Sequence, residues 1–168
     1  MIYSLLKTIN TLSPFEEAQA HCDIPCKIYD PNATQIAALS VIRFIDLIDE
    51  LDNAKDSEFK ISGHAQLSRL TRQKEIHANN VKQEVCIIWG DYFKQPQFDQ
   101  FPVIHTLAHN IMLAASACKQ TVNREKGLHL LDLVNELSEI FWETKGINTV
   151  KSECPYPPNE QVIYPQYG

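Results

Sequence analysis

The sequence predicts an all-α fold, in which four helices form an antiparallel bundle behind a short N-terminal hook. Four stretches of the 168-residue chain carry apolar residues at helical spacing. The connections between these stretches are modest in length, which favours antiparallel neighbours. No stretch shows the marked alternation of apolar and polar residues that is typical of a half-buried strand.

The first predicted helix follows Asp30, a residue type that favours the N-cap position. Pro31 then suits the first helical position, where its missing N–H costs nothing. Apolar residues recur at helical spacing from Ile36 to about residue 53. Residues 54–63 are predicted to connect this helix to the next.

Three further helices are predicted from the same periodicity. The second covers residues 64–92, and the third covers residues 103–119. Between them, residues 94–102 are rich in Pro and Gln and are predicted to form a loop. The fourth helix carries apolar residues from Leu128 onward and ends near Gly146, a residue type that favours the C-cap region.

The chain is expected to divide into three parts. Residues 1–20 are predicted to be a removable pro-segment, because they end in the small-x-small sequence Ala-Gln-Ala. Their apolar stretch is interrupted by Lys7, which makes a poor secretory signal, and we expect a cytoplasmic protein. Residues 21–146 hold the hook and the bundle. Residues 147–168 are predicted to be a Pro-rich, loosely packed or disordered tail.

The charge and hydropathy of the sequence exclude some classes of function, and its cysteines can be assigned by their surroundings. The net charge of −6, with no basic stripe, argues against nucleic acid as a partner. No run approaches the 18 apolar residues that a membrane span needs. Among the five cysteines, Cys86 and Cys118 lie in apolar helical patterns and are expected to be small core residues. Cys154 in the tail is a candidate free thiol.

The segment that begins at His21 is predicted to be a metal-binding hook. Thiolate and imidazole donors select Ni, Cu, Zn or Fe rather than Mg or Ca. If the chain is cut before His21, the new amine, the backbone nitrogen and thiolate of Cys22, and the thiolate of Cys26 form an N2S2 plane. The His21 ring is left to approach along the axis. This donor set suits square-planar Ni(II) or Cu(II) rather than tetrahedral Zn.

Two other metal sites were considered. A di-iron site in a four-helix bundle needs Glu-x-x-His on two helices, and no such motif occurs in the chain. His105 and His109 have the i, i+4 spacing of a zinc pair but lack the glutamate of His-Glu-x-x-His. We therefore expect a surface or interface role for this pair, and the same for His64 and His129.

Three blocks of the sequence resemble nickel-containing superoxide dismutases. Residues 21–31 match the pattern His-Cys-Asp-x-Pro-Cys-x-x-Tyr-Asp-Pro of that family. The second block is Trp-Gly-Asp-Tyr-Phe-Lys at 89–94, followed by Pro96 and Phe98. The third is Ile-Phe-Trp-Glu-Thr-Lys at 140–145. The blocks occur in the family's order, so the chain is identified as similar to that family.

The resemblance implies one nickel ion per subunit, bound by His21, Cys22 and Cys26. It implies superoxide as the substrate, oxygen and hydrogen peroxide as products, and cycling between Ni(II) and Ni(III). It also implies a homohexamer and a processing peptidase that releases the His21 amine. The alternative is a non-enzymatic nickel- or copper-binding helical protein.

Roles for the remaining site residues also follow from the resemblance. Tyr29 lies three residues after the last ligand, where its phenol is placed to order water or substrate, and Tyr92 is the second matching tyrosine. A buried aromatic residue with a satisfied hydroxyl is the alternative reading of Tyr29. Asp23 and Pro25 are expected to shape the hook. Lys94, together with Lys27, is a candidate for steering superoxide, although a solvated surface lysine fits equally well.

The chain departs from the family at two positions near the axial imidazole. In the family this ring is held by a Glu on the first helix and an Arg on the second. The corresponding positions here are Ala37 and His77. Outer-shell partners orient ligands and tune the metal, so these replacements are expected to weaken activity unless His77 contacts His21 instead. A histidine packed in the bundle or at a subunit contact is the alternative for His77.

Overall fold

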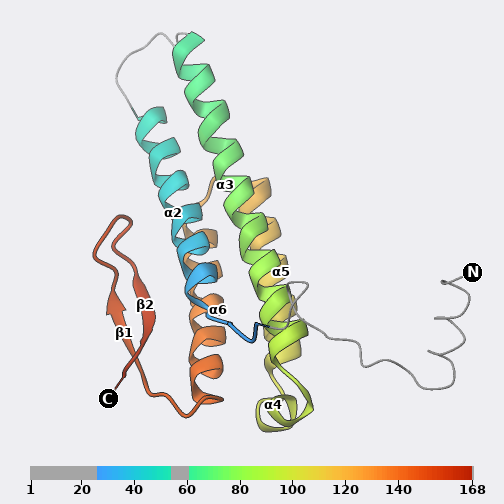
Figure 1. Cartoon of the computed structure of the whole chain (residues 1–168). Coiled ribbons are helices and arrows are strands. Elements are labelled where there is room, and N and C mark those ends of the chain that lie inside the picture. The colour runs from blue at the N-terminus through green and yellow to red at the C-terminus, as the bar shows by residue number, and fades with distance from the viewer. Residues whose placement is uncertain (1–25, 54–60, 168) are drawn as a thin grey trace, which may run out of the picture.

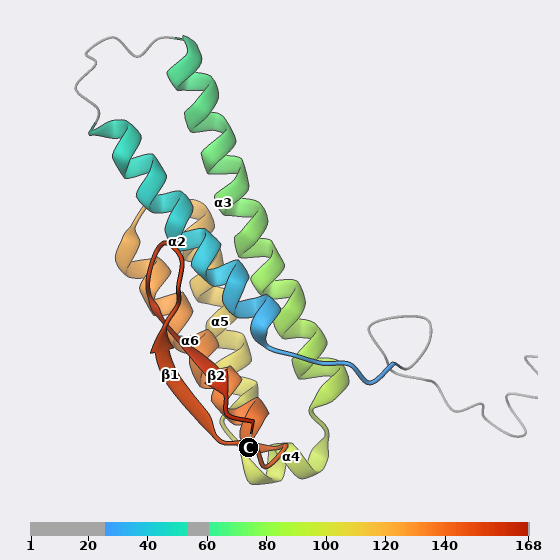
Figure 2. The same ribbon diagram turned by 60° about the vertical axis from the view of Figure 1, so that its left-hand side comes forward.

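The protein forms an antiparallel helical bundle flanked by a β-hairpin (Figures 1 and 2). A computed structural model describes residues 26–53 and 61–167. Its long helices, in chain order, are α2 (Asn32–Asp52), α3 (Ile61–Ile87), α5 (Ile104–Gln120) and α6 (Arg124–Glu143). They form a closed ring of neighbours, in which α2 packs on α3 and α6, and α5 packs on the other sides of α3 and α6. The predicted four-helix bundle is confirmed.

The ends of the helices follow the local signals in the sequence. The Asp30 carboxylate accepts a hydrogen bond from the Asn32 N–H (2.8 Å), but the N-cap residue of α2 is Pro31, so the helix starts one residue later than predicted. Gly146 has a φ of +68°, a conformation in which glycine has no Cβ penalty. This lets the Ile147 N–H turn back to the Trp142 carbonyl (3.0 Å) and ends the α6 region.

The connection between α3 and α5 is more structured than the sequence suggested. The last turn of the predicted second helix is a π-helix, η1 (Ile88–Tyr92), in which the Phe93 N–H donates to the Ile88 carbonyl (3.1 Å). The predicted loop at 94–102 contains a short helix, α4 (Gln95–Gln100). The loop prediction was wrong there, because Pro96 lies in the first turn, where a helix tolerates proline.

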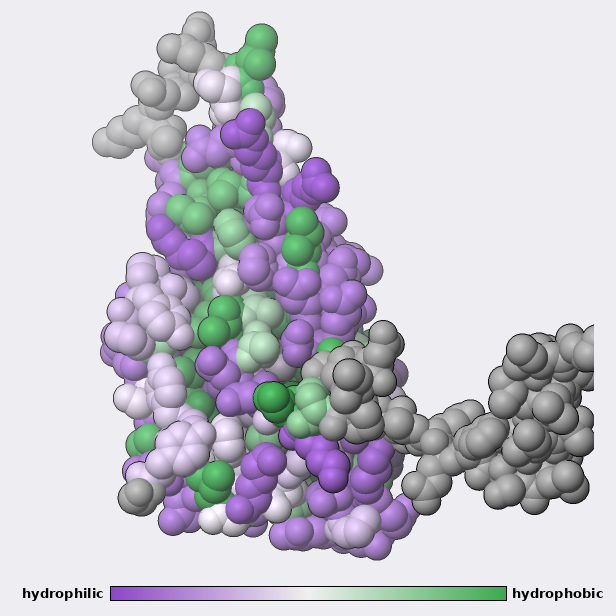
Figure 3. Space-filling view, viewed as in Figure 1, coloured by the Kyte–Doolittle hydropathy of each residue, from purple (hydrophilic) through white to green (hydrophobic). Residues whose placement is uncertain are grey.

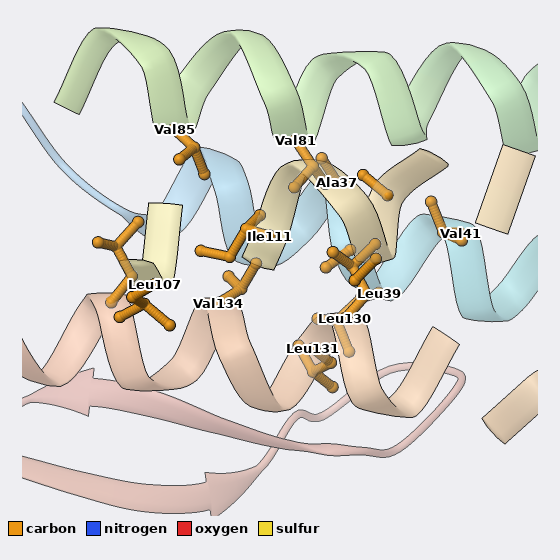
Figure 4. Packing of buried hydrophobic residues seen from close by; sticks show 14 of the residues in the cluster. Ala37, Leu39, Val41, Val81, Val85, Leu107, Ile111, Leu130, Leu131 and Val134 are labelled. Atoms are coloured by element: carbon orange, nitrogen blue, oxygen red, sulfur yellow. The ribbon is translucent and has the colours of Figure 1, made fainter. Parts of the chain in front are cut away.

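The core lies along the axis of the bundle. Figure 4 shows side chains such as Val81, Ile111 and Val134 pointing into the space between the helices. Gly127 lies where α6 meets α2, and a Cβ there would come within 2.9 Å of Ile42, so glycine permits this close approach. Cys118 is fully buried, as predicted. The core assignment of Cys86 was wrong, because that residue lies on the exposed side of α3.

Among the residues that the structure describes, one charged side chain is buried in this core. Lys74 of α3 is 1 % exposed, and its ammonium donates to the carbonyls of Cys118, Lys119 (3.1 Å) and Thr121 (2.7 Å). Burial lowers the pKa of Lys74 from its ordinary value. The three carbonyls stand at the C-terminal end of α5, where backbone acceptors have no partner within their own helix. Lys74 therefore joins α3 to α5 by satisfying that helix end.

The C-terminal segment is an ordered hairpin rather than a loose tail. Strand β1 (Thr149–Glu153) pairs antiparallel with β2 (Gln161–Pro165), with Lys151 opposite Ile163. Val162 and Ile163 of β2 are buried, and so is Cys154. The predictions of a disordered tail and of no strands were therefore wrong.

Two buried amides fasten the hairpin to the bundle. The Gln35 amide of α2 donates to the Ile163 carbonyl (3.0 Å) and to the side-chain oxygen of Asn135 (3.2 Å). Asn135 of α6 in turn donates to the Gln161 carbonyl (2.8 Å). Such buried amides are costly without partners, so the hairpin and the α2–α6 pair depend on each other.

No helix in the described ranges has both the length and the apolar character needed to cross a membrane.

We expect truncation after Gly146 to lower the free energy of unfolding by about 3 kcal/mol or more, measured by urea denaturation. The reason is that Val162 and Ile163 are buried and that each such side chain contributes about 1.5–3 kcal/mol. The substitution Lys151→Ala, on the exposed strand, is the control and should change stability little. An unchanged unfolding midpoint after truncation would show that the hairpin is not part of the cooperative fold.

Candidate functional site

Three segments distant in sequence meet at one end of the bundle. They are the described residues that precede α2, the π-turn η1 at the end of α3, and the C-terminal turn of α6 (Figure 1). The antiparallel order causes this, because α2 starts at the end of the bundle where α3 and α6 finish. The described residues of the first sequence block, from Cys26 on, thus lie at the same end of the bundle as the other two blocks.

The described part of the hook begins with exposed residues. Cys26 is exposed, and a thiolate there is accessible to a metal ion. Lys27 follows with a φ of +56°, in the left-handed region that non-glycine residues seldom adopt. His21, Cys22, Asp23 and Pro25 lie outside the described residues.

Two tyrosines, Tyr29 and Tyr92, lie next to each other at this end of the bundle. The rings of Tyr29 and Tyr92 are 5.6 Å apart between centroids and inclined by 52°. The Tyr92 ring also packs on Phe141 of α6, at 4.6 Å, and on Phe93, at 5.2 Å. Contacts of this kind favour a fixed ring position. The structure therefore brings together the two predicted site tyrosines and holds Tyr92 from α6.

The hydroxyl of Tyr92 belongs to a short row of hydrogen bonds. Its oxygen is 2.7 Å from the hydroxyl oxygen of Thr144. Thr144 donates in turn to the Phe141 carbonyl, also at 2.7 Å. Phe141 thus contacts Tyr92 directly through its ring, and its carbonyl is joined to Tyr92 only through the Thr144 hydroxyl.

Lysines give this end of the bundle positive charge. The ammonium of Lys145 lies 4.9 Å from the centroid of Tyr92 and 5.0 Å from that of Phe141, which is a cation–π arrangement with both rings. Lys94, predicted as a steering residue, donates to the Gly90 carbonyl (3.0 Å) within η1. Lys27 is exposed beside Cys26. The Lys145 ammonium therefore places a positive charge against the Tyr92 ring, on a protein whose net charge is −6.

The two positions that differ from the family lie along the α2–α3 interface. Ala37 is buried in the core. His77 is partly exposed and stacks on Phe44 of α2, with centroids 5.5 Å apart and planes inclined by 29°. A contact between His77 and His21 involves a residue outside the described ranges and stays a prediction.

The histidine pair of α5 lies next to Cys86. His105 Nδ1 accepts a hydrogen bond from the Trp89 indole (3.0 Å), and its ring stacks on Phe98 at 4.2 Å. A pocket of about 290 Å³ is lined by Cys86, Trp89, His105, Ala108, His109 and Met112. Within residues 26–53 and 61–167, no cluster of three or more His, Cys, Asp or Glu side chains is arranged to hold a metal ion.

The sequence reasoning missed Thr144 and Lys145 as site residues. Both stand in the third matched block, at 140–145, which had been used only as a sign of resemblance. Their position at the end of a helix gave no hint of a contact with Tyr92. That contact depends on the packing of α6 beside η1, which a single sequence does not display.

Comparisons with known proteins agree on one family. The family described as nickel-containing superoxide dismutase matches residues 16–145. The superoxide dismutase [Ni] of Streptomyces seoulensis is 38 % identical over 133 residues, which cover 79 % of this chain and 94 % of the relative. The enzyme of the same name from Streptomyces coelicolor is 35 % identical with the same coverage.

The fold is also similar to solved structures. The native structure of a nickel superoxide dismutase aligns with a TM-score of 0.66 at 36 % identity, covering 75 % of this chain and 99 % of that one. The match to the family ends at Lys145, immediately before the segment that forms the hairpin.

Proposed function

The chain belongs to the nickel-containing superoxide dismutase family, and we propose that His21, Cys22 and Cys26 hold its nickel ion. It is an oxidoreductase that converts superoxide to oxygen and hydrogen peroxide, with nickel as its cofactor. The observation that carries the ligand proposal is the family match over residues 16–145, which includes the hook. The non-enzymatic alternative has less support, because the relatives across this range are named as dismutases.

The donor chemistry of the hook fits nickel. Cys26 offers an exposed thiol, and its neighbours in sequence supply a second thiol and an imidazole. Soft thiolates with nitrogen donors in a plane suit Ni(II) rather than Mg or Ca. When bound, nickel supplies a one-electron couple between Ni(II) and Ni(III) that thiolate donation brings into the range of superoxide.

The protein's own residues supply binding and orientation. Tyr29 and Tyr92 present phenol groups beside the hook, where they order water or superoxide by hydrogen bonding. Lys145, Lys94 and Lys27 attract the anionic substrate locally. Asp23 and Pro25 shape the loop between the two cysteines.

The mature enzyme is proposed to begin at His21, after a peptidase removes residues 1–20. An amine at His21 is a good metal donor, whereas the amide of the uncut chain is a poor one until it loses its proton. Processing would therefore supply the His21 amine as one of the nitrogen donors that hold nickel.

We further propose that the enzyme is a cytoplasmic homohexamer with one nickel ion per subunit. Several large apolar side chains are exposed on the described surface, among them Trp89, Val103 and Leu113. Figure 3 shows that, on one face of the subunit, exposed apolar residues are separated by hydrophilic ones. Burial of apolar side chains between subunits stabilises an assembly, and light scattering of the processed protein measures its size.

Replacement of either proposed thiolate should abolish nickel-dependent activity. In Cys26→Ser, a hard hydroxyl replaces a donor that sets the metal's potential, and Cys22→Ser has the same consequence. His21→Ala should retain Ni(II) and lose most turnover, since the variant keeps the N-terminal amine and loses only the imidazole. Cys86→Ser is the control, because that thiol lies on α3 outside the hook. Full dismutase activity in Cys26→Ser would overturn the ligand assignment.

The full-length chain should be inactive, and activity should follow release of His21. Mass spectrometry of active protein from its native host should find a chain that starts at His21. Recombinant protein cut at this position and loaded with nickel should dismutate superoxide, whereas uncut protein treated identically should not. If active preparations contain only chains that begin at Met1, the processing proposal is wrong.

Two variants of His77 separate a contact with His21 from a packing role. His77→Phe keeps a ring against Phe44 but lacks ring nitrogens, whereas His77→Ala loses both. If the imidazole holds His21, turnover should fall about 10-fold or more in both variants at equal nickel content. The free energy of unfolding should fall only in His77→Ala. Normal turnover in His77→Phe would assign the residue to helix packing alone.

A further inference from the structure

We infer that Thr144 is a positioning residue that fixes the direction of the Tyr92 hydroxyl and so leaves the Tyr92 oxygen as an acceptor toward water or hydrogen peroxide. This inference deepens the proposed function and rests on it. It concerns residues at the C-terminal turn of α6 and in η1, all within the described part of the chain.

The direction follows from the two hydrogen bonds of Thr144. A backbone carbonyl only accepts, so the 2.7 Å contact with the Phe141 carbonyl requires the Thr144 hydroxyl to donate to it. Thr144 has a single hydroxyl proton and cannot also donate to Tyr92. The 2.7 Å contact between the two hydroxyls therefore needs the proton of Tyr92. The reverse order would leave two oxygens facing each other at 2.7 Å without a proton.

The hydrogen-bond chain from Tyr92 through Thr144 to the Phe141 carbonyl is held at a fixed place in the fold. Thr144 is the C-cap residue of α6, and its N–H donates to the Ile140 carbonyl (3.0 Å). The Phe141 carbonyl belongs to the last turn of the helix, where carbonyls lack helical partners and seek other donors. Since the Phe141 ring also packs on Tyr92, ring and hydroxyl are fixed together.

This direction has a chemical consequence for Tyr92. With its proton engaged by Thr144, the phenol oxygen offers lone pairs and accepts from a water or from hydrogen peroxide. The hydrogen-bond chain ends at the Phe141 carbonyl, which holds no proton to pass on. The chain is therefore not a path for protons from solvent. The overall reaction takes two superoxide ions and two protons to oxygen and hydrogen peroxide. Tyr92 is assigned to orienting the water that delivers protons, rather than to delivering its own.

Thr121 provides a matched control within the same chain. Its hydroxyl also donates to a carbonyl near a helix end, that of Ala117 (2.9 Å) in α5. It stands at the opposite end of the bundle from Tyr92, because α5 runs antiparallel to α6 (Figure 1). The substitution Thr121→Val thus removes a similar bond without touching the site.

The test compares Thr144→Val, which keeps the shape, with Thr144→Ser, which keeps the hydroxyl. In processed, nickel-loaded protein of equal metal content, Thr144→Val should lower kcat about tenfold. Thr144→Ser should stay within about twofold of the wild type, since a serine hydroxyl makes the same two bonds. Thr121→Val should match the wild type. Thr144→Ala serves in the same comparison if the valine variant does not fold.

A second measurement, by NMR, detects the hydrogen bond between Tyr92 and Thr144 without requiring metal or turnover. In metal-free protein labelled with ¹³C at tyrosine Cζ, the Tyr92 signal is assigned by its loss in Tyr92→Phe. It should shift in Thr144→Val and keep its position in Thr144→Ser and Thr121→Val. An unmoved Tyr92 signal in Thr144→Val, or a shift with unchanged kcat, would overturn the inference. Lack of dismutase activity in the wild type would instead overturn the proposed function, and the NMR comparison would still report on the hydrogen bond.

Discussion

The antiparallel packing of the four long helices is the constraint from which the rest of this structure follows. Alternation of direction places the start of α2 and the ends of α3 and α6 at one end of the bundle. Gly127, in the first turn of α6, permits close packing of α6 on α2 at the other end of the bundle. The tyrosine pair, Thr144 and Lys145 are therefore neighbours because of the fold, although more than 50 residues separate Tyr92 from Thr144.

Hydrogen bonds from buried polar side chains join neighbouring elements of this structure. Lys74 satisfies carbonyls at the end of α5, and Gln35 and Asn135 satisfy carbonyls of β2. In each case a side chain from one element pairs with backbone acceptors of another, which avoids the cost of an unpaired buried group. The hairpin lies beyond the range that matches the family, yet its contacts are built into α2 and α6. It is an integral part of this subunit.

The periodicity of apolar residues predicted the long helices well, because each of them buries a broad apolar face. It did not predict which side of α3 Cys86 faces, the two strands or the π-turn. Cys118 and Cys86 lie in similar apolar sequence, but only Cys118 faces the core. The strands are five residues long, and most of β1 is exposed, so no alternation marks them. The π-turn at η1 adds one residue to a helical turn, a shift that a helical pattern does not reveal. For the site, the tyrosines were predictable from matched motifs, whereas the roles of Thr144 and Lys145 depend on contacts between α6 and η1.

The departures from the family pattern and the retained residues occupy different parts of the subunit. Ala37 and His77 lie along the α2–α3 interface, where His77 stacks on Phe44. The tyrosines and Lys145 lie at the end of the bundle. Screening at physiological salt limits exposed charges to a range of about 8 Å. If superoxide approaches Tyr92 as proposed, the charge of Lys145, at 4.9 Å from that ring, acts on it more than the net charge of −6 does. The groups proposed to attract and orient the substrate then lie apart from Ala37 and His77, and the two sets of residues can be varied separately.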